Sequence, residues 1–237
     1  MCFVPTSSRA TRKPPKKKAS QPAEIPIRIA RRERRGEQSR EEIVAAARRV
    51  MLRDGIAATT LDAVAKEVGL TKAALYYYYP SKDALYFELI FGAVEAESRA
   101  IHDAVAKTNR GGAALRALIR ETVHTFAARM DDFRLTFMHG QVAGSSAVRF
   151  GADQFARIRP LNELAYAGAT ATLAKEWKHA RGRAGVEPRL MVFLANVAAV
   201  GILTVKGMVE SLGDPLLYSD EQLIEGLAQI FEAAATP

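Results

Sequence analysis

The sequence predicts an all-α protein in which an N-terminal helix-turn-helix precedes a larger helical domain. Three observations carry this fold class. Apolar residues recur with helical spacing from about residue 37 to the end, no run of alternating β-branched residues appears, and two short helical segments flank a single glycine within residues 60–79. A length of 237 residues suits a small domain joined to a larger one.

The segment before the first helix is strongly basic. Residues 1–35 hold 11 Lys/Arg and 2 Asp/Glu, a balance of +9, whereas residues 36–237 hold 23 and 24, a balance of −1. We expect residues 1–36 to be a disordered leader, because their Pro, Ser and Lys residues follow no apolar period, and not a signal peptide, because no apolar stretch follows the charges. A basic arm on a near-neutral body indicates that the arm binds a polyanion such as nucleic acid. The alternative is that the arm only keeps the protein soluble.

Four helices are predicted in the first half of the chain, each behind a residue that can cap it. An apolar stripe over residues 43–51 forms the first helix, and Gly55 ends it. Gly69 separates two shorter helices, and the fourth helix runs over about 82–107. The capping residues are Ser39, in a possible capping box with Glu42, and Thr60, Thr71 and Ser81.

The second half predicts a helical bundle. The strongest amphipathic pattern runs over 115–130, a short helix is expected over 133–142, and a helix over 153–181 contains a kink or break near Pro160. Residues 190–209 are apolar nearly all round, so a membrane span is one interpretation. Because the clean apolar stretch is shorter than a bilayer requires, we expect instead a helix covered by its own domain and by a partner.

Residues 60–79 indicate DNA binding. In a helix-turn-helix of this kind the second helix lies in the major groove. Four tyrosines in a row, Tyr76 to Tyr79, cannot all be core residues, because consecutive side chains on a helix point in different directions. A phenol hydroxyl can donate to a phosphate oxygen, and its ring can pack against sugar or a thymine methyl group.

The stretch from Ser39 to Leu85 resembles the DNA-binding domain of the tetracycline-repressor (TetR) family. The resemblance covers about a fifth of the chain. Ala73 stands where the family often has glycine, and Tyr79 where it often has phenylalanine, so the base preference does not carry over. The matching positions are Ile43, Ala47, Gly55, Thr60, Val64, Ala65, Gly69, Leu70, Leu75, Tyr76, Ser81, Lys82 and Leu85.

This resemblance implies a sequence-specific, DNA-binding transcription regulator. We expect a cytoplasmic, homodimeric repressor that a small hydrophobic effector releases from double-stranded operator DNA, with no cofactor, metal or membrane partner. The DNA-binding domain is expected over 37–83, and the effector-binding and dimerisation domain over 84–237. Tyr76 and Lys82 are expected to make the main contacts, within a DNA-binding set of Thr60, Thr71, Lys72, Ala73, Tyr76, Tyr77, Tyr78 and Lys82.

The middle helices, about 113–181, supply more aromatic and methionine surface than packing against one neighbour requires. We therefore expect an apolar pocket with a few polar anchors, for a hydrophobic, neutral or weakly acidic effector; a core filled by side chains that touch only one another is the alternative. The resemblance implies that the effector shifts helix 82–107 and changes the separation of two DNA-binding heads. The expected pocket residues are Phe126, Met130, Phe133, Phe137, Met138, His139, Phe155, Asn162, Tyr166 and Trp177, with His124 as a further anchor.

The last two predicted helices, about 188–211 and 220–235, are expected to pair with their copies in a four-helix dimer interface. The first is apolar on too many sides for a surface helix, and its small residues allow close helix approach. The expected interface residues are Ala195, Val197, Ala198, Gly201, Ile224, Leu227 and Phe231.

Two other function classes fit less well. An enzyme is disfavoured because the chain has no phosphate loop, no dinucleotide fingerprint and no pair of histidines at metal-ligand spacing, so no catalytic residue is assigned. The single cysteine, Cys2, can form neither an internal disulfide nor a zinc site with a second cysteine. A nonspecific, architectural DNA binder that depends on the basic leader remains as the third class.

Overall fold

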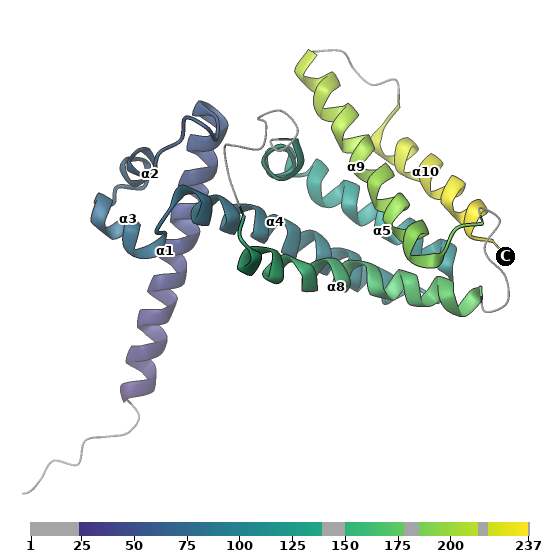
Figure 1. Cartoon of the computed structure of the whole chain (residues 1–237), viewed down its shortest axis with the longest axis horizontal. Helices are drawn as coiled ribbons and strands as arrows, with labels where there is room; N and C mark the ends of the chain where they lie inside the picture. Colours follow the sequence, from purple (N-terminus) through teal and green to yellow (C-terminus); the bar gives the residue numbers. More distant parts are fainter. Residues whose placement is uncertain (1–23, 139–149, 178–184, 213–217, 237) are drawn as a thin grey trace, which may run out of the picture. The chain divides into compact units, whose positions relative to one another are not determined.

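The computed structural model describes residues 24–138, 150–177, 185–212 and 218–236 (Figure 1). The chain divides into two compact units, residues 1–39 and 40–237. In the first unit the described part is helical and belongs to α1, Glu24–Asp54. The second unit holds the other helices, and the described ranges contain no strand, which confirms the predicted all-α fold class.

Helix α1 begins earlier than predicted, at Glu24. Ser39 lies inside this helix, so the predicted capping box is wrong, and the leader that we expected to be disordered overlaps a helix from residue 24 onward. Arg and Glu dominate this stretch, and both are good helix formers even without an apolar stripe. Residues 1–23 of the leader lie outside the described ranges. As predicted, α1 ends before Gly55, whose φ of 83° suits glycine.

Three capped helices follow and form the helix-turn-helix and its exit. Thr60, Thr71 and Ser81 each accept, through the side-chain oxygen, the backbone N–H of the third residue further on, at 3.1, 3.2 and 3.0 Å. These bonds satisfy N–H groups that a helix start otherwise leaves unpaired, so the three predicted caps are confirmed. The helices are α2, Leu61–Val68, α3, Lys72–Tyr78, and α4, Lys82–Val105.

A first hydrophobic core joins these helices, and we call it the N-terminal core. Its α1 side is the predicted stripe, in which Ile43 and Val50 are fully buried, and Leu75 and Tyr79 are buried as predicted. The core extends past residue 83, the expected end of the DNA-binding domain, into the first turns of α4. The α4 residues in it are Leu85, Tyr86, Leu89 and Ile90.

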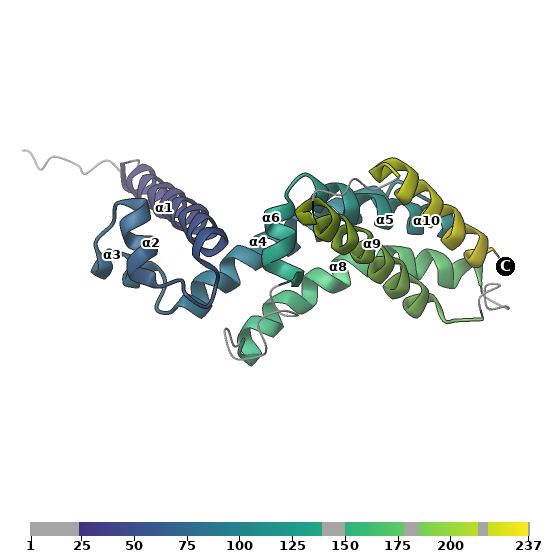
Figure 2. The ribbon, with the colours of Figure 1, turned by 90° about the horizontal axis from the view of Figure 1, so that it is seen from above.

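The remaining helices form a bundle around α5. This helix packs against α4, α8, α9 and α10, which lie around it in both views (Figure 1 and Figure 2). The helices are α5, Gly111–Ala127, α6, Met130–Phe133, the π-helical turn η1, Arg134–Met138, α8, Ala152–Glu176, α9, Pro188–Leu212, and α10, Asp220–Ala235.

Two predicted helices differ from those observed. Helix α8 runs through Pro160 without a break and ends at Glu176 instead of 181. Pro160 is exposed, so the backbone carbonyl that loses its N–H donor can be hydrated. The short helix expected over 133–142 is in fact α6 followed by η1, and its last residues lie outside the described ranges. Helix α10 has the predicted bounds.

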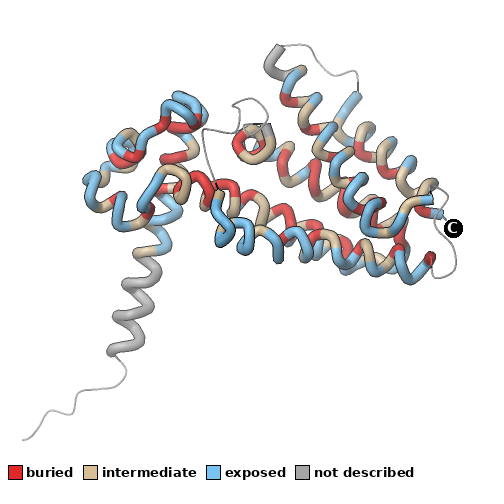
Figure 3. The backbone as a smooth tube through the Cα atoms, in the orientation of Figure 1, coloured by how far each residue is buried: buried red, intermediate tan, exposed pale blue. Residues whose placement is uncertain are grey.

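A second core, the bundle core, fills the space between these helices. Leu115, Leu118, Ile119 and Val123 of α5 are fully buried in it, which confirms the predicted amphipathic pattern. In Figure 3 buried stretches recur along α5, separated by less buried ones. Each such side chain contributes about 1.5–3 kcal/mol to folding, so α5 holds the bundle together.

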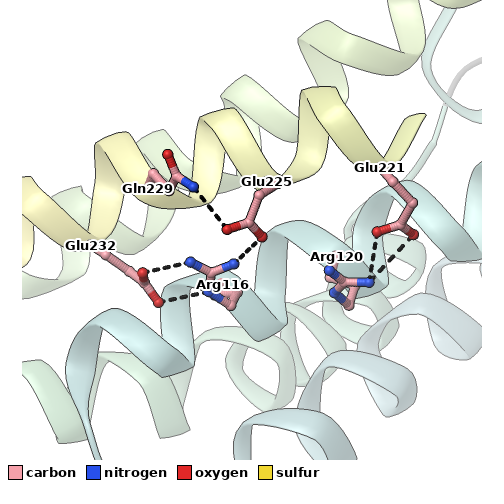
Figure 4. Close-up of polar contacts among 6 residues, drawn as sticks. All are labelled: Arg116, Arg120, Glu221, Glu225, Gln229 and Glu232. Atoms are coloured by element: carbon pink, nitrogen blue, oxygen red, sulfur yellow. Dashed lines mark hydrogen bonds and ion pairs between the residues drawn. The ribbon is translucent and has the colours of Figure 1, made fainter. Parts of the chain in front are cut away.

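Ion pairs fasten the outer face of α5 to α10 (Figure 4). The Arg116 guanidinium donates to both oxygens of Glu232, at 2.8 and 2.6 Å, and also to Glu225. One turn further on, Arg120 donates to Glu221 at 3.0 Å. Arg116 holds the pKa of Glu232 below its usual range. These pairs are partly exposed, so they fix the register of α10 on α5 more than they stabilise the fold.

Candidate nucleic-acid interface

The turn between α2 and α3 places α3 across the end of α2. Gly69 adopts a left-handed conformation with φ of 73°, and the Leu70 N–H donates to the Ala65 carbonyl at 2.9 Å. This bond ends α2 sharply, and Thr71 then starts α3 two residues later. Because the buried Leu75 anchors α3 from behind, the opposite face of α3 lies in solvent.

The exposed face of α3 carries most of the predicted DNA-contacting residues. Thr71, Lys72 and Ala73 are exposed, Tyr76 is 44% exposed, and Tyr77 is 81% exposed. Folding buries almost none of the Tyr77 ring, so the core does not explain its presence on this surface. The helix therefore presents hydroxyl, ammonium and aromatic groups together.

Tyr77 and Tyr78 lie edge to face, with ring centroids 5.4 Å apart. Tyr78 is half-buried. The Arg40 guanidinium of α1 lies over its ring, with Arg40 Cζ 5.8 Å from the ring centroid. These contacts restrict both rings at the end of α3, and a restricted aromatic side chain loses little entropy when it binds a partner.

The two predicted lysines have partners in the structure. Lys72 Nζ lies 2.8 Å from Asp62 Oδ2, and this hydrogen bond raises the pKa of Lys72. Lys82 Nζ donates to the carbonyls of Ile56 and Ala57, at 3.0 and 3.1 Å. Lys82 therefore ties the start of α4 to the loop before α2, and an ammonium group has three protons, one more than these two bonds use.

The predicted pocket residues that the structure describes lie in several different surroundings. Phe126, Phe133 and Phe137 contact one another with centroids 5.3–5.8 Å apart, and the first two are fully buried in the bundle core. Trp177 is buried too, and its Nε1 donates to the Ala235 carbonyl at 2.8 Å. Met130 packs against the same core from outside.

Other predicted pocket residues lie elsewhere. Phe155 is 55% exposed, Asn162 is exposed, and Tyr166 is half-buried on α8. His124 lies 2.8 Å from Glu221, on the outer face of α5. The side chain of Met138, and the whole of His139, lie outside the described residues.

The predicted dimer residues divide between the bundle core and an exposed stripe on α9. Ala195 and Ile224 are fully buried, whereas Val197 is 48% exposed and Gly201 is exposed. Most residues of this stripe were not predicted from the sequence, and exposed positions are visible along α9 in Figure 3. Ala198, Leu227 and Phe231 are half-buried. The exposed stripe on α9, here the α9 stripe, consists of Leu190, Leu194, Val197, Gly201, Val205 and Met208.

The segment after α5, which contains α6 and η1, links the two cores. This link was not predicted from the sequence. Phe133 lies in the bundle core and Leu135 in the N-terminal core. The Tyr86 hydroxyl of α4 donates to the Leu135 carbonyl. Next to it, Arg48 Nε of α1 lies 2.7 Å from Asp132 Oδ1, whose side chain is 3% exposed. No local pattern signals this link, because its partners lie far apart in the sequence.

Among the described residues, no three His, Cys, Asp or Glu side chains lie close enough to hold a metal ion. Residues Pro188–Val209 are long and apolar enough to cross a bilayer by length and composition alone, and 28% of that stretch is buried. Most of this apolar stretch is therefore not buried by the chain itself. Either a partner helix or a membrane could bury it.

Comparison with known proteins matches this geometry. Residues 43–89 match the family of bacterial regulatory proteins described as tetR family. No curated protein matches the chain. One similar structure is a TetR-family transcription regulator from Marinobacter aquaeolei VT8, which is 18% identical over 86% of this chain and 100% of that chain, with a TM-score of 0.65. A second is FadR from Bacillus subtilis in complex with stearoyl-CoA, which is 13% identical over 82% of this chain and 98% of that chain, with a TM-score of 0.64.

A third similar structure is AibR in complex with isovaleryl coenzyme A and operator DNA. It is 16% identical over 82% of this chain and 98% of that one, with a TM-score of 0.62. Identities this low show a shared fold, and the sequence match at residues 43–89 independently shows the helix-turn-helix domain. The resemblance found in the sequence is therefore confirmed: residues 43–89 match the N-terminal domain of the tetR family of bacterial regulatory proteins, and the chain has the fold of solved regulators of that family.

Proposed function

We propose that this regulator binds a specific operator sequence through α3. The observation that carries the proposal is the outer face of this helix, on which Lys72, Tyr76 and Tyr77 lie in solvent while Leu75 holds the helix in place. Phenol rings and an ammonium group suit a surface of sugars, phosphates and thymine methyl groups. Thr60, Thr71, Ala73 and Tyr78 complete the proposed contact surface, with Lys82 beside it.

The protein acts as a homodimer in this proposal. The exposed α9 stripe recurs every three or four residues, which is the spacing of one helix face, and Gly201 leaves room for a close approach. A twofold axis through such an interface sets two copies of α3 about 34–36 Å apart for half-sites one turn apart. The neighbouring α10 residues Leu227 and Phe231 add to the same interface.

The protein is, in this proposal, a cytoplasmic repressor that a small hydrophobic effector releases from DNA. FadR and AibR, which share its fold, form complexes with acyl-CoA molecules, and AibR also with operator DNA. Acyl-CoA thioesters are therefore the first molecules to test. The Phe126, Phe133 and Phe137 rings fill the bundle core, so an effector there needs the rings to move.

A gel-shift experiment tests the proposal. The probe is the DNA upstream of the protein's own gene, followed by selection from random duplexes. We expect a discrete complex that survives excess nonspecific DNA at physiological salt, since specific binding is typically about 10³–10⁷ tighter.

Deletion of residues 1–23 leaves α1 intact and should preserve this complex. Loss of all binding on that deletion would favour the nonspecific, architectural alternative. Release by stearoyl-CoA or isovaleryl-CoA, at concentrations that leave a control DNA-binding protein bound, supports the effector step.

A further inference from the structure

Asp62 and Lys72 form an ion pair on the solvent side of the helix-turn-helix. Asp62 lies in the first turn of α2, Lys72 is the first residue of α3, and Lys72 Nζ lies 2.8 Å from Asp62 Oδ2. The Lys72 ammonium also lies over the Tyr76 ring, 5.7 Å from its centroid. A donor, an acceptor and an aromatic ring thus share one exposed surface at the start of the helix proposed to bind the operator.

The fold does not require this pair. The Lys72 and Asp62 side chains are 64% and 57% exposed, and ion pairs that are so exposed contribute little to stability. Apolar packing holds α2 and α3 together instead, because Val64 of α2 and Leu75 of α3 are fully buried in the N-terminal core. On a surface that bound only phosphates, the Asp62 carboxylate would repel the DNA. Neither folding nor phosphate binding therefore accounts for Asp62.

The pair is complementary to the major-groove edge of a G·C base pair. Along that edge guanine presents two acceptors, N7 and O6, and cytosine then presents the N4 amino donor. The Lys72 ammonium has three protons, of which one is donated to Asp62 and two remain for N7 and O6. The Asp62 carboxylate beside it retains lone pairs that can accept the N4 proton. The N-terminal residues of a recognition helix are those that contact base edges, and Lys72 has this position in α3.

An A·T base pair fits the same two side chains less well. Its edge presents an acceptor, a donor, a second acceptor and then the thymine methyl group. Asp62 can accept from the adenine amino group while Lys72 donates to thymine O4, but the methyl group then lies where guanine offers a second acceptor. One ammonium proton is left without a partner, and leaving a polar group unpaired away from water is costly. The pair therefore favours G·C over A·T.

We propose that Asp62 and Lys72 together read one G·C base pair in each half-site of the operator, with Lys72 on guanine and Asp62 on cytosine. This inference rests on the proposed operator binding and specifies one base pair of the bound sequence. It adds Asp62 to the DNA-contacting residues predicted from the sequence. The small, exposed side chain of Ala73, next to Lys72, leaves room for the pair to approach the base edges.

Selection from random duplexes, followed by competition gel shifts at matched salt, tests the proposal. A duplex selected by the full wild-type chain is altered one position at a time, and each G·C pair is replaced by A·T. We expect one position in each half-site at which the wild-type chain prefers G·C about tenfold, as for a single mismatched base pair. At that position Asp62→Ala and Lys72→Met should each largely abolish the preference.

Glu67→Gln is the matched control. Glu67 is also an acidic residue of α2 in a partly exposed ion pair, 2.9 Å from Arg49 of α1, and its replacement should leave every base preference unchanged. If Lys72→Met weakens binding to all duplexes equally, Lys72 contacts only phosphate and the proposal is overturned. An unchanged preference in Asp62→Ala overturns it as well.

The selection also separates this inference from the proposed function. A wild-type chain that selects no sequence contradicts operator binding, and this inference with it. A selected sequence whose base preferences are the same in wild type, Asp62→Ala and Lys72→Met overturns this inference alone.

Discussion

Arg48 of α1 and Asp132 of α6 form an ion pair that joins the helix-turn-helix to the bundle. Arg48 Nε lies 2.7 Å from Asp132 Oδ1, and Arg129 Nη1 lies 3.7 Å from Oδ2. The Arg48 N–H direction does not meet hydrogen-bond geometry, so the contact is electrostatic. Asp132 is nearly inaccessible to water, and Arg48 and Arg129 are its ion-pair partners among the described residues.

The first prediction concerns this pair. Asp132→Asn removes the charge while keeping the size of the side chain, and should lower the free energy of unfolding by about 2 kcal/mol, less than for a fully buried pair because Arg48 is partly exposed. Denaturant unfolding of the full chain measures it. Asp131→Asn, whose carboxylate is exposed and pairs with Arg134, should stay within about 0.5 kcal/mol of wild type. Equal losses in both variants would contradict a special role for Asp132.

The second prediction concerns the Tyr76 hydroxyl. Tyr76→Phe keeps the ring and the fold but removes a hydrogen bond to DNA, so operator affinity should fall by about 1 kcal/mol, or about fivefold. Gel shifts at matched salt measure the change. Tyr218→Phe alters a tyrosine before α10 that is 60% exposed, more than Tyr76, and should leave affinity unchanged. Wild-type affinity in Tyr76→Phe would exclude the hydroxyl contact.

The third prediction separates the two roles of Lys82. Lys82→Met should lower the salt dependence of operator binding by about one unit of slope, because one phosphate contact is lost. It should also lower the free energy of unfolding by about 1 kcal/mol, because the Ile56 and Ala57 carbonyls lose their donor. Lys175→Met, on the exposed side of α8, serves as the control. A stability loss without a change in slope would assign Lys82 to the loop alone.

The fourth prediction concerns the α9 stripe. Val197→Glu places a charge in the middle of the proposed interface and should convert the dimer to a monomer, with loss of operator binding. Equilibrium sedimentation and gel shifts measure the two effects. Ala167→Glu introduces the same charge on an exposed face of α8 and should leave both unchanged. A wild-type chain that is monomeric at micromolar concentration would refute the dimer.

The fifth prediction concerns pH. Burial raises the pKa of Glu97 from 4.5 to about 7, although the Thr122 hydrogen bond lowers it. The folded chain therefore holds this proton more tightly than the unfolded chain, and stability falls as pH rises from about 4.5 to 7. Tyr166, the other titratable group beside Glu97, stays neutral in this window because its pKa is about 12.

Glu97→Gln should remove this loss. Its unfolding free energy should match wild type near pH 4.5 and exceed it by roughly 3 kcal/mol above pH 7. Denaturant titrations at several pH values compare the two chains. A constant difference across this range would show that Glu97 does not titrate there.

Local signals explain what the sequence could predict. The caps Thr60 and Thr71 and the left-handed Gly69 depend on residues within one turn, so the helix-turn-helix and its exposed face followed from the sequence. The contacts of α6 and η1 with α1 and α4 could not be predicted, because Arg48 and Asp132 are far apart in the chain. The pocket prediction had the same limit: aromatic residues predict buried surface, but whether rings such as Phe126 and Phe137 fill it or line it depends on packing.

The position of Phe133 and Leu135 has a consequence for how regulators of this fold can be recombined. These residues are separated by Arg134 alone, yet each completes a different core. A fragment cut at residue 83 would lack Leu135 and the α4 residues that close the N-terminal core, and should unfold or aggregate. A hybrid that joins this helix-turn-helix to a foreign sensor domain must therefore bring its own matched 130–138 segment. The unit of exchange consists of α1, α2, α3 and the first turns of α4 together with this segment, which is not contiguous with them in the chain.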